Sequence, residues 1–370
     1  MDDKGGRSGS GAREGGRPAT ARDVAPKGAN VRTHAAGGAG GAPAMPDGGR
    51  PTLKTIAFMT GLGVTTVSRA LKDAPDIGVE TRKRVKLVAS QVGYTPNRAG
   101  VRLRTGKTNV ISLILNTDEQ FMGFISDIIY GVSEELAGSP YHLILTPYSS
   151  RNDPIDPVRY VVETHSADGV IISQTEPRDA RVRYMIERGF PFATHGRTHM
   201  GLVHPYHDFD NRAFALQAVR ALARAGRRRL ALLAPSPKLS YHQHMSEGFA
   251  EGVIEEGCVE IPFRDVFVDM PIEEIKARTM KLMQRGTPPD GIVSGSGSAT
   301  FALVAAIEEC GLRLGRDIDV ATKQSSPLVQ MFRRELLVVN EDFRLAGREL
   351  ARAVKARIAG ADPATLQSLI

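Results

Sequence analysis

Short apolar runs rich in Val, Ile and Leu alternate with stretches of helical spacing from residue 109 to the end of the chain. A first series of runs covers residues 110–115, 142–145, 169–172 and 190–193, and a second covers 230–233, 266–268, 291–293 and 318–320. Strands that alternate with helices form parallel sheets with helical crossovers, so two series predict two α/β lobes. Ligands of such sheets bind beyond the carboxyl ends of the strands, which predicts a binding site between the lobes.

The basic residues are concentrated before this α/β region. The 370 residues include 48 Lys and Arg against 41 Asp and Glu, a net charge of +7. Residues 51–108 hold 11 basic and 3 acidic side chains, a net charge of +8, whereas residues 109–370 carry −4. A basic segment joined to a mildly acidic body predicts a small nucleic-acid-binding domain attached to a sensing or catalytic body.

Residues 1–50 have a composition that does not support a packed core. They hold 13 of the 38 glycines and almost no branched or aromatic apolar side chain, so burial cannot offset the chain entropy lost on folding. We predict a disordered tail over residues 1–50. Met45 lies just before the first predicted helix, which raises the hypothesis that the natural chain begins there and lacks residues 1–44.

The remaining composition bounds the cellular location. Two cysteines in 370 residues encode no disulfide framework, and no apolar run approaches the roughly 20 residues that span a bilayer. The N-terminus also lacks the apolar stretch of a signal peptide. These features predict a cytoplasmic protein, associated with the nucleoid if it binds DNA, and no membrane partner.

Residues 51–94 have the pattern of three short helices. Thr52 can cap the first helix, and Gly61-Leu62-Gly63 supplies the tight turn expected of a helix-turn-helix. The second helix, over 64–71, turns small or hydroxylated side chains and one arginine outward, which suits a major groove about 12 Å wide. A third helix is expected over 79–92. The alternative interpretation is a solvated three-helix domain without a ligand.

Four motifs in this segment occur in the order and spacing of a known family. They are Thr52-Leu53-Lys54-Thr55-Ile56-Ala57, Thr66-Val67-Ser68-Arg69-Ala70-Leu71, Thr81-Arg82 and Gly93-Tyr94-Thr95-Pro96-Asn97. The chain thereby resembles the LacI/GalR family of bacterial transcription regulators. Further motifs follow in the family's order: Asp210-Asn211, Gly248-Phe249, Asp290-Gly291-Ile292-Val293 and Asp342-Phe343-Arg344-Leu345-Ala346-Gly347.

The resemblance implies an α + α/β protein in three parts. A helix-turn-helix headpiece would cover 51–95, a hinge helix and linker 96–108, and a two-lobed core like that of periplasmic binding proteins 109–370. We expect one lobe to comprise about 109–195 plus 323–340, and the other 196–322 plus 341–370. The core would bind a small effector and control the geometry of a homodimer, and a homodimer suits a palindromic operator in double-stranded DNA.

The resemblance and the exposed helix faces together assign residues to DNA. Arg69 is the candidate for a bidentate guanine contact, and Leu103 falls where the family's hinge helix inserts a leucine into the minor groove. The full set is Thr52, Val64, Thr65, Thr66, Ser68, Arg69, Asn97, Arg98, Arg102 and Leu103.

The expected effector site departs from the family pattern. Members commonly carry Arg where Met245 stands, an Asn-Asp pair where Ser296-Gly297 stands, and Asp where Gln324 stands. Because Arg and Asp form strong hydrogen bonds with sugar hydroxyls, their loss weakens a prediction of a simple sugar, although a sugar or sugar derivative stays a candidate. The polar candidates by position, each of which could equally be structural, are Asn116, Ser173, His195, Arg197, Ser296, Gln324 and Glu341.

No catalytic residues, cofactor or metal are predicted. G-x-S-x-G, G-x-G-x-x-G and H-E-x-x-H are all absent, and the histidines clustered between 195 and 244 lack metal-ligand spacing. The sequence predicts a sequence-specific DNA-binding regulator, a repressor rather than an enzyme, under the control of a small molecule. A regulator without an effector is the alternative, and a solute-binding protein or a sugar-modifying enzyme is a remote one.

Overall fold

The computed structural model describes residues 50–95, 102, 105–116, 124–149, 151–324 and 326–370. It divides into two compact units, Met1–Thr95 and Pro96–Ile370. The tail predicted over 1–50 lies outside the described residues except for Arg50. None of the helices in the described ranges combines the length and apolar character that crossing a bilayer requires.

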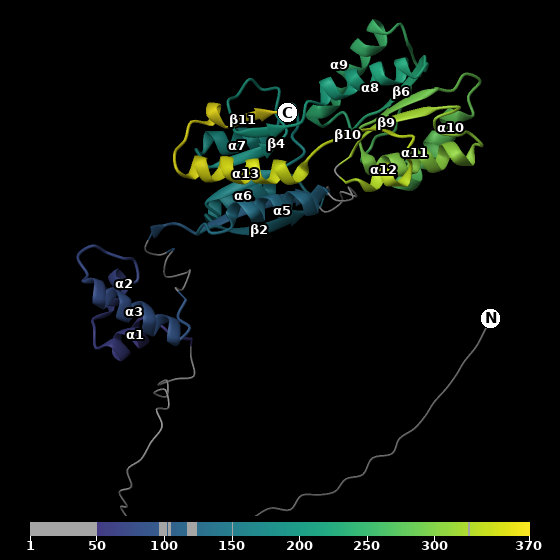
Figure 1. The fold of residues 1–370 in the computed structure, drawn as a ribbon. Coiled ribbons are helices and arrows are strands. Elements are labelled where there is room, and N and C mark those ends of the chain that lie inside the picture. Colours follow the sequence, from purple (N-terminus) through teal and green to yellow (C-terminus); the bar gives the residue numbers. More distant parts are fainter. Residues whose placement is uncertain (1–49, 96–101, 103–104, 117–123, 150, 325) are drawn as a thin grey trace, which may run out of the picture. The chain divides into compact units, whose positions relative to one another are not determined.

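The first unit is the predicted helix-turn-helix (Figure 1). Its helices are α1 (Leu53–Thr60), α2 (Val64–Ala70) and α3 (Val79–Gln91). Thr52 caps α1 by accepting a hydrogen bond from the Thr55 N–H, and the Thr55 hydroxyl accepts one from the Thr52 N–H. Gly61 ends α1 in the left-handed region, at φ +68°. A small core that includes Ile56, Val67 and Val85 joins the three helices.

The second unit contains two parallel sheets, and the first has the order β11-β5-β4-β3-β1-β2. Its strands are β1 (Val110–Asn116), β2 (His142–Tyr148), β3 (Gly169–Ile172), β4 (Phe192–His195), β5 (Tyr206–Asp208) and β11 (Gln367–Leu369). On β1, Ile111 and Leu113 face a core built with α5 (Phe124–Leu136) and α13 (Phe343–Ile358). Val110 and Ile114 face the opposite core, built with α6 (Ile155–Thr164) and α7 (Ala180–Glu187). Burial on both faces explains the unbroken apolar run.

The second sheet has the order β10-β9-β8-β6-β7. Its strands are β6 (Arg229–Leu233), β7 (Val259–Glu260), β8 (Gly291–Ser294), β9 (Asp319–Gln324) and β10 (Leu337–Asn340). One face packs against α8 (Asn211–Arg224) and α9 (Ser240–Glu255), and the other against α10 (Ile272–Met283) and α11 (Gly297–Glu309). A short helix, α12 (Leu328–Phe332), and a 3₁₀ turn, η1 (Pro363–Leu366), complete the elements described.

The predicted division of the core into lobes is wrong at its C-terminal boundaries. Residues 323–340 belong to the second sheet, because β10 pairs with β9, and α13 in the 341–370 segment packs against the first sheet (Figure 1). Residues 196–208 also belong to the first lobe, because β5 pairs with β4. The chain therefore crosses between the lobes at 209–210 and again at 341–342. Strand pairing decides lobe membership, and the pairing partners are remote in sequence.

One predicted strand is also wrong. Residues 266–268 form no strand, and Val266 and Val268 are instead buried loop residues of the second lobe's core. The strand in this part of the chain is the two-residue β7, whose side chains are exposed. Burial of the two valines produces the same apolar pattern as a strand would, although the backbone makes turns there.

Candidate functional site

The exposed face of α2 carries the side chains expected to contact DNA. Val64, Thr65 and Arg69 are exposed, whereas Thr66 and Ser68 are partly buried. Val67 and Ala70 point into the core of the unit and hold the helix against α1 and α3. Residues 64, 65 and 69 thus lie on the solvent side, where a DNA groove could receive them. Thr52 is exposed as well, and its hydroxyl caps α1.

Arg69 already has a partner in the headpiece. Its Nη2 lies 2.5 Å from an Asp76 carboxylate oxygen in the loop between α2 and α3. Arg69 is the one charged residue on α2, so this ion pair neutralises the helix.

The hinge predicted over 96–108 is mostly outside the described residues, including Asn97, Arg98 and Leu103. Arg102 is described, has helical backbone, and accepts a hydrogen bond at its carbonyl from the Gly106 N–H. Its guanidinium donates to the carbonyl of Thr164 at the end of α6, at 2.8 Å. In this structure Arg102 therefore contacts the core.

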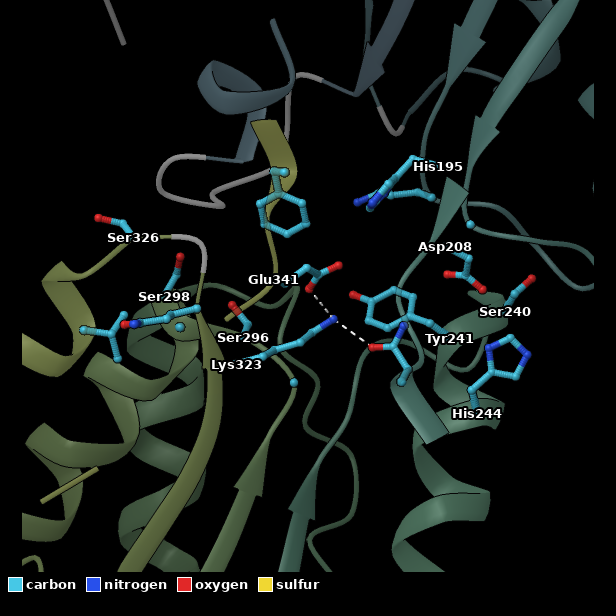
Figure 2. Close-up of a pocket in the computed structure, with 18 of the residues that line it drawn as sticks. His195, Asp208, Ser240, Tyr241, His244, Ser296, Ser298, Lys323, Ser326 and Glu341 are labelled. Carbon is cyan, nitrogen blue, oxygen red and sulfur yellow. Dashed lines mark hydrogen bonds and ion pairs between the residues drawn. The ribbon is translucent and has the colours of Figure 1, made fainter. Parts of the chain in front are cut away.

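A cavity of about 190 Å³ lies between the two sheets of the second unit (Figure 2). Residues at the carboxyl ends of β4, β5, β8, β9 and β10 line it, as the rule for parallel sheets predicts. Five predicted effector residues meet there: His195, Arg197, Ser296, Gln324 and Glu341.

Two predicted effector residues lie elsewhere. Asn116 lines a second cavity of about 320 Å³, which shares Gln174 and Ser298 with the first. Ser173 is buried and lines neither cavity, and its carbonyl accepts a hydrogen bond from Arg181.

Lys323 is the centre of a buried polar network in the cavity wall (Figure 2). Its Nζ lies 2.7 Å from a Glu341 carboxylate oxygen and donates to Asn211 Oδ1 at 2.8 Å. It also lies 5.2 Å from the ring centroid of Phe209 and 5.1 Å from that of Tyr241, within range of cation–π attraction. Asn211 directly follows the first crossover between the lobes and Glu341 lies in the second, so Lys323 links both crossovers to the end of β9.

A second ion pair lies across the cavity. Arg197 Nε is 3.1 Å from a carboxylate oxygen of Asp208, which is almost fully buried. Burial raises the pKa of Asp208 to about 7, although the Arg197 cation opposes the shift. Burial also lowers the pKa of His195 to about 3 and that of His244 to about 4, and neighbouring positive charge adds to both shifts. At neutral pH both histidines are uncharged.

Besides oxygens of the two carboxyl groups, two polar atoms of the described lining residues have no hydrogen-bond partner. Ser240 Oγ and His244 Nδ1 are both buried, from the N-terminal half of α9. The other ring nitrogen of His244 is 2.9 Å from His199 Nε2, so one of these two nitrogens carries the shared proton. A buried hydroxyl and ring nitrogen without partners are groups that a polar ligand would satisfy.

The sequence prediction missed several lining residues, chiefly Asp208, Asn211, Ser240, Tyr241, His244 and Lys323. Lys323 had a usable signal, because a lysine within a buried strand must find a partner. Asp208 and His244 had no such signal, since short β5 and the face of α9 are visible only in the folded chain. Met245, which occupies the family's arginine position, is fully buried in the second lobe's core and does not line the cavity.

No three His, Cys, Asp or Glu side chains come close enough to hold a metal ion in the part of the chain that the structure describes. The titratable side chains of the cavity instead interact in pairs, namely Lys323 with Glu341, Arg197 with Asp208 and His244 with His199.

Comparison with protein families matches both units. Residues 52–97 match the family described as "Bacterial regulatory proteins, lacI family", and residues 219–370 match "Periplasmic binding protein-like domain". The HTH-type transcriptional regulator RafR of Escherichia coli is 31% identical over 320 residues, which cover 85% of this chain and 94% of RafR.

Two solved structures are similar over nearly their full length. The transcriptional regulator CelR in complex with cellobiose has a TM-score of 0.63 and 25% sequence identity, over 87% of this chain and 97% of that one. The Lac repressor dimer bound to operator and an anti-inducer has a TM-score of 0.75 and 18% identity, over 87% and 96%. The latter similarity confirms the predicted fold, a helix-turn-helix headpiece with a two-lobed α/β core.

Proposed function

This chain belongs to the lacI family of bacterial regulatory proteins, and we propose that a neutral sugar in the cavity between its lobes controls its binding to operator DNA. The protein is a DNA-binding transcriptional regulator. The observation that carries the effector half of the proposal is the cavity itself, in which Lys323 and Arg197 each face a carboxyl group and several polar atoms have no hydrogen-bond partner. A repressor acting in the cytoplasm is the form of regulator that we propose.

The proposed DNA contact uses α2 as the helix that enters the major groove. Its exposed residues are small, hydroxylated or, at Arg69, able to donate two parallel hydrogen bonds to guanine N7 and O6. One such helix per subunit requires a homodimer to contact the two half-sites of a palindrome. Residues of the 96–108 hinge would add minor-groove contacts.

The proposed effector is uncharged and rich in hydroxyls. In the first cavity Lys323 faces Glu341, and Arg197 faces Asp208, which is about half ionised at neutral pH, so little positive charge there remains to attract a phosphate or a uronate. Paired carboxylates still accept hydrogen bonds from hydroxyl groups, and Ser240 and His244 add further polar atoms. Phe301 and Phe343 add apolar surface against which a sugar ring can pack.

The second cavity supports an effector of more than one sugar ring. It shares Gln174 and Ser298 with the first, and its lining adds the polar residues Asn116, Tyr148 and Lys238. The similar regulator CelR was solved with cellobiose, which is a disaccharide. We therefore propose a disaccharide or longer oligosaccharide that occupies both cavities.

A ligand screen tests the effector. We expect neutral disaccharides and trisaccharides to raise the melting temperature of the full chain and to weaken its binding to a palindromic duplex enriched from a random library. Glucuronate, glucose 6-phosphate and cytidine serve as charged and nucleoside comparisons and should have no effect. A response confined to an acidic sugar would contradict the proposal.

A pair of variants tests the DNA contact. Arg69→Ala should lower the ratio of affinities for the preferred and the substituted base at one base pair of each half-site by roughly 5- to 100-fold. Lys83→Ala, which removes an exposed cation from α3, should change affinity for all sequences alike. If Arg69→Ala also weakened all sequences equally, α2 would not be the helix that recognises bases.

A regulator without an effector is the second candidate. It is favoured by the residues that replace the family's polar sugar contacts, since Met245 is buried in the core and Ser296 caps α11. In that case no compound in the screen would change the melting temperature or the DNA affinity.

A further inference from the structure

The ion pair between Arg69 and Asp76 occurs on the helix proposed to contact bases. The two side chains are about half exposed, 53% and 47%, and the separation of Nη2 from the carboxylate oxygen is 2.5 Å. An exposed ion pair of this kind contributes little to stability. The main consequence of this ion pair is therefore the orientation that it gives to the Arg69 side chain.

The loop that carries Asp76 is held at several points. The Ala74 N–H donates to the Arg69 carbonyl at 3.1 Å, and Ile77 packs against the core of the headpiece. Asp73 in the same loop pairs with Lys86 of α3 at 2.6 Å, and its carbonyl accepts from Arg82. The Ala74 hydrogen bond, the packing of Ile77 and the contact of Arg82 with the Asp73 carbonyl require no carboxylate, so they place Asp76 beside Arg69 independently of both ion pairs in the loop.

An arginine held in this way can still contact a base. The guanidinium has five N–H donors, two of them on Nη2, so a carboxylate that occupies one Nη2 N–H leaves the other to form a fork with Nη1 toward guanine N7 and O6. Holding the side chain in one rotamer before binding removes an entropy cost that a free arginine would meet on the DNA. The carboxylate also offsets the one charge on α2, so Arg69 gains less from a phosphate of any sequence.

We propose that Asp76 is a positioning residue that holds Arg69 for a guanine and suppresses its contacts with phosphate, so that Asp76 raises sequence discrimination rather than affinity. This inference rests on the proposed role of Arg69 in base recognition. Asp76 acts on base recognition through Arg69 and does not itself contact a base.

The test compares two variants with the same change of charge. Asp76→Asn removes the carboxylate beside Arg69, and Asp73→Asn removes the one beside Lys86 in the same loop. Asn suits both sites, including the positive φ of 58° at residue 73. The probe is the palindromic duplex that the wild-type full chain enriches from a random library, together with single base-pair variants of it, and the base pair that Arg69 contacts is located with Arg69→Ala.

We expect Asp76→Asn to lower discrimination about fivefold at the base pair located with Arg69→Ala, and to raise affinity for unrelated duplexes. Asp73→Asn should raise affinity for all duplexes without changing discrimination. Asp76→Glu, which keeps the carboxylate, should retain much of the discrimination that Asp76→Asn loses. Equal effects of Asp76→Asn and Asp73→Asn would overturn the positioning role, as would a large fall in the melting temperature of Asp76→Asn. If Arg69→Ala changed discrimination at no base pair, the proposed base contact itself would be wrong. If Arg69→Ala changed discrimination and Asp76→Asn did not, only the positioning role of Asp76 would be wrong.

Discussion

Two cations, the buried Lys323 and the partly exposed Arg197, determine the electrostatics of the cavity between the lobes. Each is paired with a carboxylate, Glu341 or Asp208, and the side chains of Lys323 and Glu341 are 9% and 6% exposed. Removing one member of a buried pair leaves an uncompensated charge, which costs far more than loss of the whole pair. The pairs therefore matter for stability as well as for the choice of a ligand.

Lys323→Met should be strongly destabilising for this reason. We expect the free energy of unfolding to fall by about 3 kcal/mol, because Glu341 would lose its cation. The double variant Lys323→Met/Glu341→Gln should recover a large part of the loss, which urea unfolding measures. Lys276→Met, which breaks the exposed pair with Glu309, is the matched control and should cost less than about 1 kcal/mol. Additive effects of the two changes at 323 and 341 would contradict this account.

Asp208 should make stability depend on pH. Its pKa is about 7 in the folded chain against an ordinary 3.8, so its contribution to stability is complete below pH 3.8 and is lost as the pH rises through 7. The lowered pKa values of His195 and His244 act in the opposite direction, since their contribution is present above 6.5 and is lost on acidification.

Asp208→Asn separates this carboxyl from the histidines. The free energy of unfolding of the wild-type chain relative to the variant should fall from about pH 5 to pH 7 and level off by about pH 8. Urea unfolding at each pH gives this difference, in which the histidine contributions cancel. A difference that stays constant with pH would show that Asp208 keeps an ordinary pKa.

At the scale of elements, two pairs of helices approach closely through glycine. A Cβ on Gly347 of α13 would overlap the Ile128 carbonyl of α5, and one on Gly131 of α5 would overlap the Arg344 carbonyl of α13. Gly248 of α9 has the same relation to Arg212 of α8. The backbones can therefore pack at distances that a side chain would prevent.

Gly347→Ala should disturb the first lobe. The added methyl meets backbone rather than a movable side chain, so we expect a loss of about 2 kcal/mol in the free energy of unfolding. Gly286→Ala, at an exposed site with open space around the position of the new Cβ, should change stability by less than about 0.5 kcal/mol. Equal denaturation midpoints for the two variants would disprove close packing of α5 on α13.

At the scale of the whole molecule, charge is divided between the two functions. Residues 51–108 carry +8 and residues 109–370 carry −4, so the basic segment alone accounts for attraction to the DNA backbone. The cavity takes little part in this asymmetry, because each of its two cations faces a carboxyl group.

Salt should therefore weaken DNA binding steeply and effector binding little. For a dimer with six to ten phosphate contacts we expect the affinity for the enriched duplex to fall by about 10³-fold or more between about 50 and 200 mM KCl. Effector affinity, measured by calorimetry over the same range, should change by less than about twofold. A shallow salt dependence of DNA binding would contradict the electrostatic role of the headpiece.

The sequence by itself determined the kind of protein, the headpiece helices and the strands that are buried on both faces. Local signals suffice for the Thr52 cap, the Gly61 turn and the strands that are buried on both faces, because each depends on neighbours in the chain. The charge of each segment is likewise a property of composition. Of the seven residues that the sequence proposed for the effector, by their positions after predicted strands and within the family pattern, five line the first cavity.

Only the tertiary structure decided which lobe each segment belongs to and which ion pairs and hydrogen bonds form in the cavity. The pairing of β10 with β9 and of β11 with β5 is set by long-range hydrogen bonds, and two- or three-residue strands carry no periodic signal. Lys323 and Asn211 bond across 112 positions of the chain, and Asp208 reaches its pKa of about 7 through burial. Contacts between remote residues and the desolvation they cause arise when the sheets assemble, so no local pattern encodes them.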